Sequence, residues 1–182
     1  GFDEMYFFIA GRVFEQPENV RTYSRQEFET LFAFRHQENP QQTLQVQREQ
    51  LDYHLDDWEI VNQSAQGFRL IRSVSVRKMA HGQLIALCPP DGEQFFLAQT
   101  SWLMQEREGG LIAGVDALPG LPQPIAARPL EADGSLPGKY QPAFILPAIA
   151  AAQGEQSLVL PAGWYRPGRI VELYTDRAGP VR

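Results

Sequence analysis

The 182-residue chain contains little of what builds covalent or metal-based frameworks. Its single cysteine, Cys88, cannot form an internal disulfide, and no Cys/His spacing matches a zinc site. The three histidines, His36, His54 and His81, stand far apart in the sequence. We therefore predict no disulfide, no metal site and no cofactor.

Long apolar runs are also missing. The most apolar stretch, residues 144–152, is short and contains Pro147, so no segment can span a bilayer as a helix. No signal peptide is visible, and we therefore expect a soluble, cytoplasmic protein.

Positive charge is scarce, with 16 Lys and Arg against 22 Asp and Glu and a net charge of -6. Proteins that bind nucleic acid non-specifically need a basic face, so we predict no nucleic-acid partner. The balance still permits a small anion at a local basic patch. Such a patch lies between residues 69 and 78, which include Arg69, Arg72, Arg77 and Lys78 and no acid. It is either a solvated strand face or an anion-binding surface.

The apolar pattern indicates a mainly β chain with a helical or mixed segment over residues 1–44. Ser24 and Glu27 fit a capping box, which predicts a helix from about Arg25 to His36 that Asn39-Pro40 ends. Residues 2–14 are ambiguous between helix and strand. The glutamine-rich residues 41–50 read as a first strand or a connector.

From Trp58 the apolar period changes to two, which is typical of strands. A hairpin is predicted over residues 58–71, followed by strands near 84–88, 95–104 and 111–115, as in a small barrel or sandwich. Residues 119–142 are rich in proline and read as a connector or edge segment. Residues 143–182 carry three further short strands, and we expect them to form a small β subdomain packed on the barrel.

One constellation of polar residues lies at the predicted hairpin. Asn62, Ser64 and Gly67 form the pattern N-x-S-x-x-G, in which the carboxamide and the hydroxyl can face the same way. Gly67 permits a positive φ or a close approach of a ligand to the backbone. The same three residues also suit an ordinary hairpin turn.

Catalytic patterns are missing. Ser64 is not in a G-x-S-x-G elbow, Asp56 and Asp57 would point to opposite faces of a strand, and no phosphate-binding G-x-x-x-x-G-K occurs. We predict that the chain is not an enzyme and has no catalytic residue.

The stretch from Asp57 to Leu70 resembles the [D/N]-x-S-x-x-G motif of the PilZ family. Residues 98–102, ending in Trp102, and Gly114-Val115-Asp116 are similar to two further features of that family, in the same order. The resemblance covers residues 45–118. It implies a six-stranded β-barrel that binds cyclic di-GMP, with Asn62, Ser64 and Gly67 contacting the ligand.

The family's second motif, R-x-x-x-R, supplies arginines that bind phosphates and guanine edges. Its one match here is Arg21 to Arg25, which lies 37 positions before Asn62 (62 minus 25). The resemblance therefore implies Arg21 and Arg25 as ligand contacts. The basic patch at residues 69–78 adds Arg69 and Arg72 as further candidates.

Because the R-x-x-x-R match lies so far before Asn62, an alternative stays open: a degenerate PilZ-like adaptor that binds a protein partner and no nucleotide. A third idea, single-stranded nucleic acid on Trp58, Trp102 and Arg69, conflicts with the acidic balance. The oligomeric state stays undetermined by the sequence.

Overall fold

A computed structural model describes residues 1–17, 40–73, 78–106, 109–130, 138–149, 155–175 and 179–181. The chain is mainly β, as predicted, with helix α1 (Phe2–Ala10) at its start. A second described helix is α3 (Pro40–Gln50). The strands are β1 (Glu59–Gln63), β2 (Gly67–Arg72), β3 (Leu84–Leu87), β4 (Phe96–Gln105), β5 (Leu111–Ala117), β6 (Gln123–Leu130), β7 (Gln141–Leu146), β8 (Ser157–Val159), β9 (Ile170–Thr175) and β10 (Gly179–Val181). The helix predicted from Arg25 to His36 lies outside the described residues.

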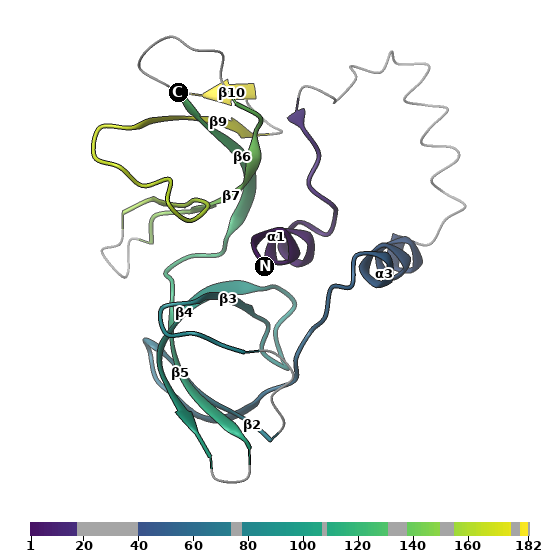
Figure 1. The fold of residues 1–182 in the computed structure, drawn as a ribbon, viewed down its shortest axis with the longest axis vertical. Coiled ribbons are helices and arrows are strands. Elements are labelled where there is room, and N and C mark those ends of the chain that lie inside the picture. Colours follow the sequence, from purple (N-terminus) through teal and green to yellow (C-terminus); the bar gives the residue numbers. More distant parts are fainter. Residues whose placement is uncertain are drawn as a thin grey trace. The chain divides into compact units, whose positions relative to one another are not determined.

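The strands form two five-stranded sheets, with the orders β1-β2-β5-β4-β3 and β10-β9-β6-β7-β8 (Figure 1). The chain divides into two compact units. Unit 1 contains residues 1–55, 125–142 and 161–182, and unit 2 contains residues 56–124 and 143–160. The predicted divisions at 1–44, 45–118, 119–142 and 143–182 are consecutive along the chain, whereas these units interleave. A six-stranded barrel stays a prediction.

Strand β6 shows why the segments interleave. It lies in the proline-rich stretch predicted as a connector or edge segment, yet residues 126–130 pair with residues 170–174 of β9, and β6 lies in the middle of its sheet. Pro124 precedes the paired residues, and Pro129 is the last residue but one of the strand. In an antiparallel ladder only alternate amides point to a given neighbour, so proline is tolerated at such positions.

Helix α1 resolves the ambiguity of residues 2–14. Asp3 and Glu4 lie in its first turn, where the helix dipole favours acids, and Gly11 ends it with φ 66°. The buried rings of Tyr6 and Phe7 anchor the helix in unit 1.

Helix α3 overturns the prediction of a strand or connector over residues 41–50. Pro40, predicted to end the preceding helix, instead begins α3. Proline suits the first turn of a helix because the amide that it lacks has no helical partner there. The Gln, Leu, Arg and Glu residues that follow are good helix formers and outweigh the alternation of Leu44 and Val46.

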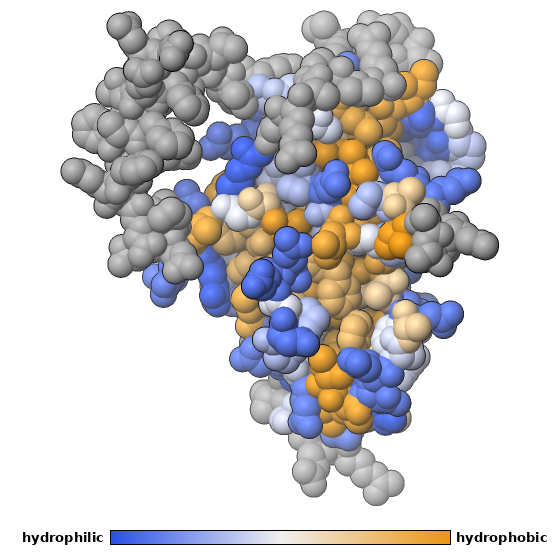
Figure 2. Space-filling view, turned by 180° about the vertical axis from the view of Figure 1, so that it is seen from behind, coloured by the Kyte–Doolittle hydropathy of each residue, from blue (hydrophilic) through white to orange (hydrophobic). Residues whose placement is uncertain are grey.

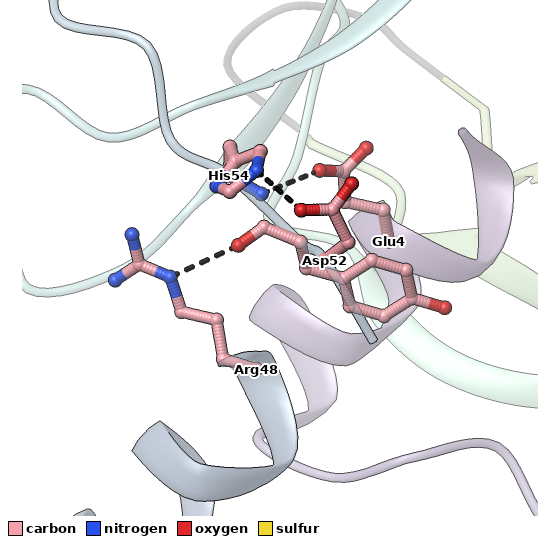
Figure 3. A network of polar contacts seen from close by, with 5 residues as sticks. Glu4, Arg48, Asp52 and His54 are labelled. Carbon is pink, nitrogen blue, oxygen red and sulfur yellow. Dashed lines mark hydrogen bonds and ion pairs between the residues drawn. The ribbon is translucent and has the colours of Figure 1, made fainter. Parts of the chain in front are cut away.

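One polar contact joins the segment after α3 to α1, and two more order that segment (Figure 3). The His54 amide donates to the Glu4 carboxylate at 2.9 Å, and the His54 ring lies 2.7 Å from the carboxylate of Asp52. The Arg48 guanidinium donates to the carbonyl of Tyr53 at 3.0 Å. Burial, followed by the charges of Asp3 and Glu4, raises the pKa of the Tyr53 hydroxyl. These contacts fix the chain just before unit 2 begins.

In unit 2, the inner face of the first sheet forms the core. Leu70, Ala98, Ala113 and Val115 are buried there, and partly buried aromatic and aliphatic side chains pack around them. Strands β4 and β5 are long and strongly curved (Figure 1). The opposite face of the same strands carries exposed polar side chains together with buried apolar ones, Leu97 and Ile112.

A buried ionic network stabilises unit 1. Glu172 on β9 is 4% exposed and lies opposite Arg128 on β6. Its carboxylate accepts from Arg128 Nε at 2.6 Å and from the Tyr140 hydroxyl at 2.8 Å. The Arg128 guanidinium also lies 4.2 Å from the centre of the Tyr140 ring. The buried charge is thereby compensated by both a cation and a hydrogen bond.

We expect Glu172→Gln to lower the free energy of unfolding by about 3 kcal/mol, because it leaves the Arg128 charge without its buried counter-ion. Urea unfolding followed by circular dichroism measures this change. Glu15→Gln, at an exposed position of the same unit, is the matched control. Equal midpoints for the two variants would contradict the structural role of Glu172.

Candidate functional site

The N-x-S-x-x-G motif forms the predicted hairpin between β1 and β2. Its turn has two central residues, Ala65 and Gln66, and is closed by the Ser64 amide donating to the Gly67 carbonyl at 2.9 Å. The Ser64 hydroxyl accepts from the amides of Gly67 and Gln66 at 3.2 and 3.3 Å. Ser64, predicted as a ligand contact, therefore holds the turn together with its own side chain.

Gly67 is required by the neighbouring strand. Its φ lies outside the left-handed region, so of the two possibilities raised for this glycine, a positive φ or a close approach to the backbone, the first does not apply. A Cβ atom at this position would overlap the carbonyl oxygen of Val115 and lie 3.1 Å from Cα of Asp116. The missing side chain lets β2 and β5 approach each other closely. This strand packing explains the glycine at position 67 without any need for a ligand to approach the backbone there.

Arg69 and Arg72 lie on opposite faces of β2, because residues three apart in a strand cannot share a face. Arg72 points to the core side and is 7% exposed. Its guanidinium donates to the Asp56 carboxylate at 2.6 Å and lies 4.6 Å from the centre of the Trp58 ring. The structure thus places Arg72 in an ion pair away from Asn62, the residue it was predicted to assist.

Arg69 lies in a row of four residues across the outer face of the sheet. Asn62 on β1 is opposite Arg69 on β2, Arg69 is opposite Gly114 on β5, and Gly114 is opposite Trp102 on β4. The Arg69 guanidinium lies 5.9 Å from the centre of the Trp102 ring. We call Asn62, Arg69, Gly114 and Trp102 the outer row.

Gly114 allows the indole to lie on the sheet. A Cβ atom at this position would overlap Nε1 and Cε2 of Trp102. The ring therefore covers the bare backbone of β5, and Trp102 as a whole remains 42% exposed. An exposed tryptophan beside an arginine is a surface on which a flat aromatic group can stack.

Irregular strand pairing turns both ends of the outer row outward. The register of β4 against β5 shifts between Thr100 and Trp102, and that of β1 against β2 shifts between Ile60 and Asn62. Thr100 is buried, and without the shift Trp102 would share its face. Sequence reasoning named Trp102 as a motif residue but could not place its ring beside Arg69.

The polar groups of the outer row are available for binding. Asn62 and Arg69 are both exposed, and neither side chain makes a hydrogen bond or an ion pair within the described ranges. A carboxamide offers a donor and an acceptor, and a guanidinium suits a phosphate or a guanine edge. Arg21 and Arg25 lie outside the described residues.

Two other site classes find no support in the part of the chain that the structure describes. Among these residues, no three His, Cys, Asp or Glu side chains are grouped to hold a metal ion. None of the described helices is both long and apolar enough to cross a membrane.

Gly67→Ala should lower the free energy of unfolding by about 2 kcal/mol, because the new methyl group collides with the backbone of β5. Gly138→Ala, at an exposed glycine with no atom within 4 Å of the added Cβ, should leave it unchanged or slightly raised. Chemical denaturation of both variants is the measurement. A stable Gly67→Ala protein would show that the glycine is not needed for strand packing.

Replacement of the two β2 arginines should affect the free energy of unfolding very differently, because one arginine is buried and the other is exposed. Arg72→Ala breaks a largely buried ion pair, and we expect a loss of about 2 kcal/mol in unfolding free energy. Arg69→Ala, on the exposed face, should change it by less than about 0.5 kcal/mol. A similar loss in both variants would contradict the two-faced assignment of β2.

Comparison with known proteins bears on both units. Residues 125–181 match the family described as FimW C-terminal beta-barrel domain. The chain is 28% identical over 123 residues to the cyclic-di-GMP receptor FimW of Pseudomonas aeruginosa. That alignment covers 67% of this chain and 20% of the relative, so the chain spans about a fifth of the relative's length. No solved structure matches the chain.

Proposed function

We propose that the chain is a cyclic di-GMP receptor domain that binds its ligand on the outer row. The observation that carries this proposal is the exposed pair of Arg69 and Trp102 on either side of Gly114. The similarity to a protein named as a cyclic-di-GMP receptor supports it independently. A PilZ-type, six-stranded barrel around this face belongs to the same proposal.

The chemistry of the row matches that of the ligand. Cyclic di-GMP has two guanine bases and two phosphates, so it needs a flat apolar surface and positive charge close together. Trp102 supplies the stacking surface, and Arg69 supplies a cation able to bind a phosphate or the O6/N7 edge of guanine. In a chain of net charge -6, such a local cation attracts an anion that the rest of the surface repels.

Asn62 completes the proposed contacts at the β1 end of the row. Its carboxamide offers both a donor and an acceptor, which suits a base edge or a phosphate oxygen. Arg21 and Arg25 are proposed as further phosphate ligands by the resemblance to the R-x-x-x-R motif. Ser64 and Gly67 contribute indirectly, because they set the turn that presents Asn62.

A protein partner is the second candidate, and exposed apolar residues favour it. Val61 is 51% exposed and Met104 is 48% exposed, close to the two ends of the outer row. Figure 2 shows hydrophobic residues at the surface of the end of unit 2 where β4 and β5 approach their connecting turn. An adaptor without a nucleotide would use this apolar surface and would not require Arg69.

Isothermal titration with cyclic di-GMP tests the proposal. We expect the unaltered chain to bind, and Arg69→Ala and Trp102→Ala each to weaken binding about tenfold or more, because each removes a charged or stacking contact. Gly114→Ala should weaken binding similarly, since the added methyl group displaces the indole while leaving it in the chain.

Matched controls come from unit 1. Arg166→Ala removes an exposed arginine, and Tyr165→Ala removes an aromatic side chain that is 86% exposed. Both should bind as the unaltered chain does. No heat of binding at tens of micromolar protein would reject the receptor proposal and favour the adaptor.

A further inference from the structure

We propose that Asp116 reads the hydrogen-bond donors of a guanine base stacked on Trp102, and so makes the outer face selective for guanine over adenine. This inference rests on the proposed function, because it assigns the base selectivity of the same face. It concerns a residue outside the N-x-S-x-x-G and R-x-x-x-R patterns.

The sheet register places Asp116 beside the outer row. Asp116 lies two residues after Gly114 on β5, so both residues face outward. The spacing of two residues along a strand is about 7 Å. Because the indole of Trp102 covers Gly114, the Asp116 carboxylate lies one step along the sheet from the stacking surface.

The neighbours of Asp116 leave its carboxylate accessible. On one side its partner is Gly67, which has no side chain, and on the other it is Gln99. The Gln99 carboxamide donates to the carbonyl of Gly82 at 3.0 Å. Asp116 is exposed, and its carboxylate makes no hydrogen bond or ion pair with any residue that the structure describes.

An ionised carboxylate is an acceptor with two oxygens. Guanine presents two adjacent donors, N1–H and the exocyclic N2 amine, which one carboxylate can accept together. Adenine presents an unprotonated N1 at the same edge, so its lone pair would face the negative charge of Asp116. Well-formed bidentate contacts to a base are worth about 1–3 kcal/mol of discrimination.

The negative charge of Asp116 determines which part of the ligand it can face. A carboxylate next to a dianionic ligand is unfavourable if it faces a phosphate, and favourable if it faces the donors of the base. Arg69 is opposite Gly114, two residues before Asp116 on β5. No ion pair joins Arg69 and Asp116 among the described residues. The two charges therefore orient the ligand, with its phosphates toward Arg69 and its guanine edge toward Asp116.

Three ligands and one variant test this. Cyclic di-GMP, cyclic di-IMP and cyclic di-AMP are titrated into the unaltered chain and into Asp116→Asn. Cyclic di-IMP keeps N1–H, O6 and N7 but lacks the N2 amine. The unaltered chain should prefer cyclic di-GMP to cyclic di-IMP by about tenfold and should bind cyclic di-AMP more weakly still.

In Asp116→Asn, the affinity for cyclic di-GMP should fall about tenfold, and its preference over cyclic di-IMP should shrink. Asp91→Asn, at another exposed aspartate of unit 2, should change neither. Tighter binding of all three ligands by Asp116→Asn would overturn the inference, because it would mean that the carboxylate only repels phosphate.

Equal affinity of the unaltered chain for cyclic di-GMP and cyclic di-IMP would also overturn it, without any dependence on a variant. This result differs from a failure of the proposed function, in which the unaltered chain binds none of the three ligands. That second result rejects both proposals together.

Discussion

The contact between Trp102 and the bare backbone at Gly114 is the constraint on which the outer face depends. A Cβ atom at Gly114 would overlap the indole of Trp102, so the ring can occupy this place only because β5 carries no side chain there. The irregular pairing of β4 turns the ring outward, and Arg69 flanks it from β2. Stacking surface and cation are thus arranged by backbone geometry rather than by a flexible loop, which favours a site formed before any ligand arrives.

The N-x-S-x-x-G pattern divides into one displayed residue and two supporting ones. Ser64 caps the turn with its hydroxyl, Gly67 lets two strands meet, and Asn62 alone presents an uncommitted polar group within the described chain. A motif of this kind therefore predicts a hairpin turn more directly than it predicts the binding of a ligand. The structural roles of Ser64 and Gly67 do not conflict with contact with a ligand, which stays a prediction for both residues.

Local signals predicted the features that depend on local physics. Alternation and turn residues located the hairpin at 58–71 and the strands β3, β4, β5, β7, β8 and β9. They misassigned α3, where two alternating apolar residues suggested a strand although the intervening glutamines favour a helix. The burial of Arg72 depends on Asp56, sixteen residues earlier, and the pairing of β6 depends on β9. Such partners are set by tertiary packing and leave no mark in a short window of sequence.

The opposite orientation of Arg69 and Arg72 gives the turn at Ser64 an importance beyond the hairpin itself. Side chains alternate strictly along β2, so the register that Ser64 and Gly67 impose decides which arginine reaches solvent and which one pairs with Asp56. A shift of one position would bring Leu70 to the surface and bury an unpaired guanidinium in its place. The length of the four-residue turn therefore determines which charged side chains lie on the outer face of the first sheet.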